Sequence, residues 1–251
     1  MSSPLIIYGV PFSQPVRAVL WLMLYKQKSF EMALINPGSS SEGGSRHPDY
    51  LAKFPTGTIP SIEDKETGFV LSESHAIMCY LCNTFGWNDL YPSNYEERAK
   101  VDSYLHLHHR NVREASVGLV APKVRKDLNF SEDFLKISQA NIDKAFKALE
   151  DGWLANSRYL TGDQLTIADM SAYVEIGQLQ SKFTNVYDFT LFPNIRRWIE
   201  EMNQVNYHDE VHASLYELGD ISSEAPSMET IINANKKGFI VLQEQLVKMK
   251  D

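Results

Sequence analysis

The stretch PFSQPVRAVLWLMLYK, which begins at Pro11, places a serine two positions ahead of a proline at the start of an apolar segment. Proline is favoured in the first turn of a helix, so the pattern predicts a helix that opens at Pro15. Gln14 is then the expected cap, and the Ser13 hydroxyl is left free near the positive end of the helix dipole, which favours a bound anion. Arg17 is expected to add positive charge at the same place.

Two other roles for Ser13 stand beside this one. An N-cap is the commonest role of a serine ahead of a helix, and it remains open. A nucleophilic serine needs a neighbouring general base, and the sequence has no G-x-S-x-G elbow. The chemical role that we predict is therefore a hydrogen bond from the Ser13 hydroxyl to an anion of a bound molecule.

The stretch GTIPSI, followed by LSES, forms a second group of candidate residues. Pro60 lies between two β-type segments, where it cannot donate to a ladder, and indicates an edge or a cis turn. The backbone of Ile59 is then free to pair with an extended, peptide-like ligand. Glu73 and Ser74 close a strand and open a helix, where a hydroxyl and the helix amides suit a carboxylate. Each element alone is equally typical of plain structure, but their joint order indicates a binding site.

Length and composition limit the classes of function. The chain has 251 residues, 43% hydrophobic and 22% charged, which is typical of a soluble globular protein of one large or two ordinary domains. With 24 basic and 32 acidic residues the net charge is -8, which argues against a nucleic-acid binder. We see no signal peptide and no membrane span, and expect a cytoplasmic protein. Cys79 and Cys82 lie within an apolar helical run, so we expect core thiols.

The first third of the sequence alternates between strand and helix patterns. LIIYG and FEMALI are the first two expected strands, and the helix between them has one apolar face. The glycine- and serine-rich stretch NPGSSSEGGSR predicts a mobile surface loop. A helical turn at 50–54, strands in TIPSIED and GFVLSES, and a helix in HAIMCYLCNTF follow. This order, β-α-β-(α)-β-β-α, is typical of a small α/β layer fold.

The pattern changes at GWNDLYPSNYEE, around residues 86–94, and helix signals dominate after it. We therefore predict a boundary between an α/β domain, residues 1–85, and an all-α domain, residues 94–251. Within the second domain, Thr166 and Asp169 form the pattern of a capping box. The expected helices span residues 96–119, 132–156, 166–183, 193–203 and 207–218.

Residues 219–251 form a C-terminal extension of the second domain. GDISSEAPS is typical of a linker, and apolar residues recur at helical spacing from Met228 to Met249. A helix with such a stripe must pack on something. Three interpretations remain open: a lid over the active site, a contact with a partner subunit, and a structural cover for an apolar groove.

Taken together, these motifs resemble the glutathione transferase family. S-Q-P-x-R-A-V after a short first strand, P-x-G-T-I-P, and E-S ahead of a helix occur in the family's order, and the serine type resembles the theta class. ERAKVDSYL and YLTGDQLTIADM are similar to two helices of that family, so the resemblance covers about residues 4–218. It implies a thioredoxin-like N-terminal domain that binds glutathione and an all-α C-terminal domain that shapes an electrophile pocket.

The resemblance implies how glutathione is held near its sulfur. Ser13 donates to the sulfur, and Ile59 pairs main chain to main chain with the cysteinyl unit. Thr58 and Pro60, expected to be cis, flank Ile59 in the same motif. A free thiol has a pKa of ~8.5, and the thiolate is the nucleophile, so a hydroxyl donor at a helix N-terminus favours the reactive form.

The resemblance also implies contacts with the two ends of glutathione. Glu73 and Ser74 hold the γ-glutamyl end, and Asp102 reaches the γ-glutamyl amine across a homodimer interface. Relatives of the theta class often hold the glycyl carboxylate with a histidine in the loop before the cis-proline motif, and this sequence departs from that position. The candidates here are Ser45, Arg46, His47 and Lys53, and the sequence does not choose among them.

Phe12, His109, Arg113 and Ser116 are the expected residues of the electrophile pocket, the last three because they repeat at helical spacing after Asp102. The histidines of LHLHHR have no carboxylate or cysteine to complete a metal set, so we expect no metal. The predicted function is glutathione transfer to small electrophiles, with glutathione peroxidase or dehalogenase activity as related possibilities. The alternative is a non-catalytic glutathione-binding or regulatory module of the same fold.

Overall fold

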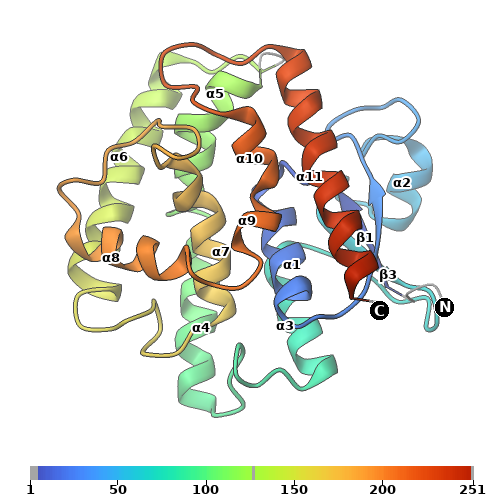
Figure 1. Cartoon of the computed structure of the whole chain (residues 1–251), viewed down its shortest axis with the longest axis horizontal. Helices are drawn as coiled ribbons and strands as arrows, with labels where there is room; N and C mark the ends of the chain where they lie inside the picture. Colours follow the sequence, from blue (N-terminus) through green and yellow to red (C-terminus); the bar gives the residue numbers. More distant parts are fainter. Residues whose placement is uncertain (1–4, 126–127, 250–251) are drawn as a thin grey trace.

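A computed structural model describes residues 5–125 and 128–249 (Figure 1). The outer limits of the two predicted domains, residues 1 and 251, lie outside the described residues. The α/β part contains a sheet of order β2-β1-β3-β4, in which β1 runs parallel to β2 and antiparallel to β3. Its elements are β1 (Leu5–Gly9), α1 (Gln14–Tyr25), β2 (Glu31–Leu34), α2 (Pro48–Lys53), β3 (Ser61–Asp64), β4 (Val70–Ser72) and α3 (Ser74–Phe85). The predicted order of elements and the predicted thioredoxin-like class are confirmed.

Helix α1 lies at the junction of the two parts of the molecule (Figure 1). The sequence pattern predicts one buried face, yet all residues from 16 to 24 are buried. The reason is that α1 packs against α3 of its own part and against α7 (Ile167–Ile176) and α9 (His208–Val211) of the helical part. Its start also approaches β1 closely, because a Cβ on Gly9 would lie 2.6 Å from a methyl of Val16.

The described residues after α3 are mainly helical, which confirms the predicted all-α part. Thr166 and Asp169 form the predicted capping box at the start of α7. The helices are α4 (Tyr95–His108), α5 (Ala121–Val124), α6 (Glu132–Ala148), α7 (Ile167–Ile176), α8 (Pro193–Met202), α9 (His208–Val211), α10 (Ala213–Leu218) and α11 (Met228–Lys248), with π-helical turns at Ala115–Val120 and Leu149–Trp153 and a 3-10 helix at Gly177–Leu179.

The single helix predicted over residues 96–119 is wrong. Helix α4 ends well before that point, and Ala115–Val120 forms a π-helical turn. This turn packs tightly on α6, since a Cβ on Gly118 would lie only 2.7 Å from the Cβ of Ser138. The turn also directs Ser116 towards α7. Turns of this kind often occur at functional sites.

Helix α11 runs beside α10 and reaches back to the α/β part (Figure 1). The apolar stripe predicted for it is buried only in part: Leu242 and Leu246 are buried, whereas Met228 and Ile232 are exposed. Helices α10 and α9 are its main neighbours. Within the described residues, no helix has the length and apolar character needed to cross a membrane.

Candidate active site

Ser13 occupies the N-cap position of α1, and Gln14 and Pro15 are the first helical residues. The helix therefore begins one residue earlier than predicted, because proline is accommodated at the second helical position as well as at the first. The Ser13 backbone is fixed: its N–H donates to the Val10 carbonyl at 3.1 Å, and its carbonyl accepts from Arg17 N at 2.9 Å. Its side chain makes no capping hydrogen bond. The prediction that Gln14 is the cap is therefore wrong, but the prediction that the Ser13 hydroxyl takes no part in capping is confirmed.

Ser13 lines a cavity of about 310 Å³ between the two parts of the molecule. The cavity draws on the start of α1, the loop before β3 and the π-helical turn after α4. Of the residues proposed from the sequence, it brings together Phe12, Ser13, Ser45, Arg46, Thr58, Ile59, Arg113 and Ser116.

Ile59 lines this cavity. The Ile59–Pro60 peptide bond is cis, as predicted. A hydrogen bond from α2 holds the loop that contains Ile59: the Tyr50 hydroxyl donates to the Thr58 carbonyl at 2.7 Å. The N–H and C=O of Ile59 make no hydrogen bond within the described residues. An unpaired N–H and C=O at the wall of a cavity are suited to an extended, peptide-like ligand.

The candidates for the glycyl carboxylate separate in space. Arg46 lines the cavity, and one of its guanidinium nitrogens donates to the Thr56 carbonyl at 3.3 Å. Ser45 also lines it, but its hydroxyl already accepts from Gly38 N at 2.9 Å. His47 is the N-cap of α2, and Lys53 is paired with Glu63 at 2.7 Å; neither lines the cavity.

Glu73 and Ser74 begin α3, as predicted, but do not line the cavity. Glu73 has a φ of 78°, a left-handed conformation that costs a residue other than glycine about 1–3 kcal/mol. His109 lies near the start of α3, with its ring centre 4.9 Å from that of His75. It does not line the cavity, so the prediction that it is a pocket residue is not met there. Burial lowers the pKa of His109, and the charge of Glu73 acts in the opposite direction.

Asp102 lies on α4, away from the cavity, and accepts a hydrogen bond from the Tyr91 hydroxyl at 2.8 Å. The two cysteines of the neighbouring α3 belong to the core or its edge. Burial raises the pKa of Cys79 to about 11 and that of Cys82 to about 12. Thiols of this kind are unreactive at neutral pH, in agreement with the predicted structural role.

Arg17 does not stand beside the Ser13 hydroxyl, as the sequence pattern suggested. Its side chain is completely buried, and it lies beneath the cavity wall. The guanidinium donates to the carbonyls of Phe12, at 2.5 Å, and Val174, at 3.1 Å. Burial lowers its pKa to about 9, while the nearby Glu175 acts in the opposite direction. Arg17 thus joins α1 to α7 and holds the turn before Ser13.

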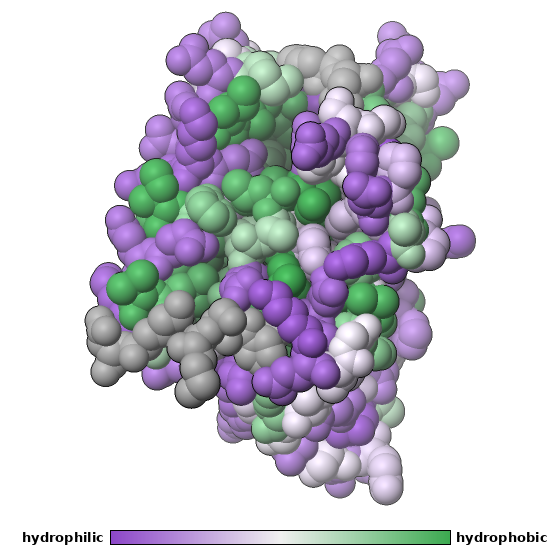
Figure 2. Space-filling view, turned by 90° about the vertical axis from the view of Figure 1, so that its right-hand side faces the viewer, coloured by the Kyte–Doolittle hydropathy of each residue, from purple (hydrophilic) through white to green (hydrophobic). Residues whose placement is uncertain are grey.

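A second cavity, of about 730 Å³, adjoins the first. The two share Val10, Phe12, Pro37, Val124 and Arg125. Helix α11 contributes one wall through apolar side chains such as Ile231 and Phe239, and the end of β2 contributes another. Figure 2 shows apolar side chains gathered on this side of the molecule. The space beside Ser13 therefore continues into a larger, mostly apolar one.

Comparisons with known proteins agree with this geometry. The chain matches the family description "Glutathione S-transferase, N-terminal domain" over residues 7–89 and "Glutathione S-transferase, C-terminal domain" over residues 104–206. The chain belongs to the glutathione S-transferase family. The family resemblance drawn from the motifs is thereby confirmed.

Theta-class proteins are among the relatives of this family member. Glutathione S-transferase T2 of Arabidopsis thaliana is 31% identical over 92% of the chain, which spans only 40% of that relative. Glutathione S-transferase T1 of the same plant is 29% identical, over 90% of this chain and 94% of the relative. The structure of human glutathione S-transferase T1-1 is similar in fold, with a TM-score of 0.72, 23% identity, and coverage of 96% of this chain and 99% of that one.

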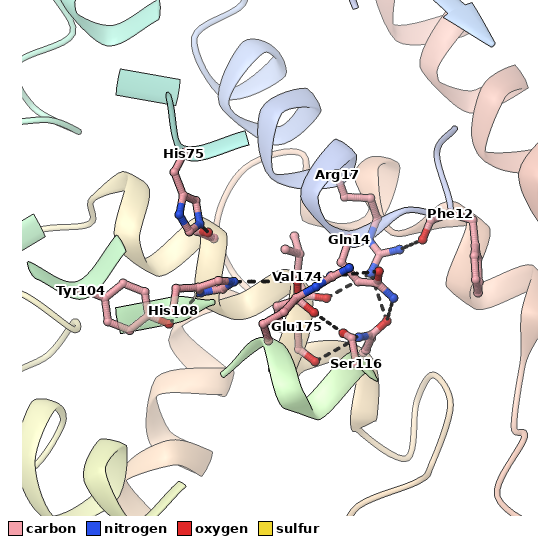
Figure 3. A network of polar contacts seen from close by, with 12 residues as sticks. Phe12, Gln14, Arg17, His75, Tyr104, His108, Ser116, Val174 and Glu175 are labelled. Atoms are coloured by element: carbon pink, nitrogen blue, oxygen red, sulfur yellow. Dashed lines mark hydrogen bonds and ion pairs between the residues drawn. The ribbon is translucent and has the colours of Figure 1, made fainter. Parts of the chain in front are cut away.

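Beside the first cavity of this family member lies a polar network centred on Glu175 of α7 (Figure 3). Its carboxylate accepts from Arg113 at 2.6 Å and from the Ser116 hydroxyl, and the His108 ring lies 3.8 Å away. Burial alone would raise the pKa of Glu175, but Arg113, His108 and Ser116 outweigh it and hold the pKa at about 2. Gln178 connects this network to Gln14, next to Ser13, at 3.0 Å.

Sequence reasoning missed this carboxylate. The signal was a single glutamate in the apolar run MSAYVEI, because a charged residue in a buried helix is rare unless it is paired. Arg113 and Ser116 were predicted as pocket residues, and both line the first cavity. Both side chains also donate to the Glu175 carboxylate, so they connect the cavity wall to this buried charge.

Proposed function

We propose that the protein is a glutathione transferase in which the Ser13 hydroxyl stabilises the glutathione thiolate. The observation that carries the proposal is the free hydroxyl of Ser13, at the start of α1, in one cavity with the unpaired main chain of Ile59. A cysteinyl unit paired with Ile59 directs its sulfur across this cavity. The Ser13 hydroxyl and the helix N-terminus then meet the negative charge.

The energy required is moderate. Lowering the pKa of a thiol from ~8.5 by about two units corresponds to ~2.7 kcal/mol of preference for the thiolate. A hydrogen bond to a charged group contributes ~1.5–3 kcal/mol, and a helix N-terminus contributes ~0.3–1 kcal/mol. Together these two contributions amount to ~1.8–4 kcal/mol, which covers most or all of the requirement without a further cation beside Ser13.

The ends of glutathione would contact other residues. Arg46 is the preferred partner of the glycyl carboxylate, since it is a cation that lines the cavity. Glu73 and Ser74, at the start of α3, would hold the γ-glutamyl end, and the strained backbone of Glu73 is typical of a functional position. The γ-glutamyl amine would meet Asp102 of a second subunit. A cytoplasmic homodimer is part of this proposal.

The second cavity is the proposed electrophile site. Its apolar walls suit small electrophiles such as alkyl halides, activated alkenes and organic hydroperoxides. With an alkyl halide, the thiolate sulfur forms a bond to carbon as the halide ion leaves. Phe12 lines both cavities and is therefore placed where sulfur and electrophile would meet. Arg113 and Ser116 line the glutathione side, and His109 lines neither cavity.

Replacement of the hydroxyl tests the proposal. We expect Ser13→Ala to lower kcat about 10- to 100-fold at neutral pH, with little change in the KM for glutathione, because the thiolate fraction falls while the binding contacts remain. Turnover is measured with glutathione and an alkyl halide, an organic hydroperoxide and an aromatic halide. The matched control is Ser103→Ala, an exposed serine of α4.

Two outcomes would contradict the proposal. Wild-type rates in Ser13→Ala would remove the hydroxyl from the mechanism. Firm glutathione binding without turnover of any of the three electrophiles would favour the alternative, a glutathione-binding or regulatory module. The unpartnered hydroxyl favours the enzyme, because a scaffold has no use for it.

A further inference from the structure

The turn that carries Ser13 is fixed by side chains from three separate helices. The Ser214 hydroxyl of α10 donates to the Pro11 carbonyl at 3.3 Å. The Phe12 N–H donates to the side-chain oxygen Oδ1 of Asn235, on α11, at 3.2 Å. The Phe12 carbonyl accepts from Arg17 of α1. Side chains from outside the turn therefore hold three consecutive backbone groups next to Ser13: the Pro11 carbonyl, the Phe12 N–H and the Phe12 carbonyl.

Helix α11 is built to make this contact. Gly238 lies against the turn, where an added Cβ would be 2.8 Å from the Cβ of Pro11 and 3.1 Å from that of Ser214. Asn235 lies three residues earlier and so shares that face of the helix. Its amide nitrogen Nδ2 donates to the Ile231 carbonyl at 3.1 Å, which leaves Oδ1 as the acceptor for Phe12. The glycine permits the approach, and the asparagine provides the hydrogen bond.

Asn235 also lines the second, apolar cavity, together with Phe12. The same helix thus forms a wall of the larger cavity and holds the turn that presents the serine. Hydroxyl donation to a sulfur requires the donor to be held within about 0.5 Å of the productive geometry. A turn released by even 1 Å would weaken that hydrogen bond.

We propose that Asn235 is a positioning residue: through the Phe12 N–H it holds the Ser13 hydroxyl in place, so that α11 takes part in thiolate activation as well as in closing the apolar cavity. The inference rests on the proposed function of Ser13. Asn235 acts through Ser13, and its loss should therefore matter only while the hydroxyl is present.

The test compares Asn235→Leu, which keeps the branched side-chain shape without the hydrogen-bonding groups, and Asn235→Ala with Asn233→Leu and Asn233→Ala in the full chain. Asn233 is an exposed asparagine two residues earlier on α11. We expect both Asn235 variants to lower kcat about three- to tenfold, the loss of one hydrogen bond. The pKa of bound glutathione, followed by thiolate absorbance in the ultraviolet, should rise, and the KM for glutathione should change less than twofold. The Asn233 variants should match wild type.

A double variant separates positioning from plain structure. With Ser13→Ala already present, Asn235→Leu should cause no further loss of kcat, because the hydroxyl that it positions is gone. An equal loss in both backgrounds would overturn the inference. So would an unchanged kcat and thiol pKa in Asn235→Leu.

A measurement without substrate distinguishes failure of this inference from failure of the proposed function. Amide hydrogen exchange at Phe12 should be faster in Asn235→Leu than in wild type or Asn233→Leu. Unchanged exchange would overturn the inference even if Ser13 proves catalytic. An inactive wild type, or a Ser13→Ala variant as active as wild type, would overturn the proposed function and with it the catalytic part of the inference, whereas faster exchange would still establish the contact.

Discussion

The buried carboxylate of Glu175 should give the protein a characteristic acid response. Its folded pKa of about 2 lies below the ordinary 4.5, so it contributes stability that is present above pH ~4.5 and is lost as the pH falls towards 2. We expect Glu175→Gln to lower the free energy of unfolding at pH 7 by about 2–4 kcal/mol, because Arg113 and His108 lose a buried partner. Urea unfolding at pH 7 and pH 3 measures this: the loss should shrink at pH 3. The control is Glu200→Gln, on the exposed face of α8, and an equal loss at both pH values would contradict the prediction.

Residues near in sequence to their partners could be predicted, and residues with distant partners could not. Ser13 and Ile59 are marked by nearby prolines, whose local effects are fixed by covalent geometry. Glu175 and Asn235 act on segments more than fifty residues away, and the pairing exists only after folding. Arg17 shows the limit: its spacing from Ser13 suggested a shared site, but its side chain turns inward to two carbonyl groups.

At the scale of elements, the packing of α11 on the serine turn leads to a prediction for Gly238. An added Cβ lies within 3.0 Å of Pro11, so α11 or the turn has to move. We expect Gly238→Ala to lower the free energy of unfolding by about 1 kcal/mol, since overpacking costs ~1–3 kcal/mol and alanine returns up to ~1 kcal/mol of helix propensity. It should also lower kcat, as we expect of Asn235→Leu. Lys237→Ala, exposed on the same helix, is the control, and a Gly238→Ala variant more stable than wild type in urea would show that the contact is loose.

The elements themselves were largely predictable, because hydrophobic periodicity and caps are local signals. The strand β1 and the start of α7 at its capping box follow the sequence closely. The break between α4 and the π-helical turn was missed, since nothing in the local pattern interrupts the helix. Its cause is tertiary: Gly118 packs on α6 while Ser116 turns to the charge on α7.

At the scale of the whole molecule, the two parts should unfold as one unit although the sequence divides into two domains. Trp21 belongs to α1, yet its ring is fully buried and packs against Tyr173 and His212 of the helical part. Its indole N–H donates to the Asn206 carbonyl at 2.9 Å, also in that part. Separating the parts would expose this face of α1 to water, so neither part has a complete core alone.

We therefore expect Trp21→Leu to lower the stability of both parts equally, by about 2–4 kcal/mol, the usual cost of removing a large buried ring. Native-state hydrogen exchange at Ile7 in β1 and at Phe146 in α6 measures the two parts separately. The control is Trp87→Leu, at a half-exposed tryptophan after α3. It should cause a smaller loss of stability at both Ile7 and Phe146. A loss confined to either Ile7 or Phe146 would mean that the parts open independently. In that case the cavity between them, with Ser13 on one side and Arg113 on the other, would open without global unfolding.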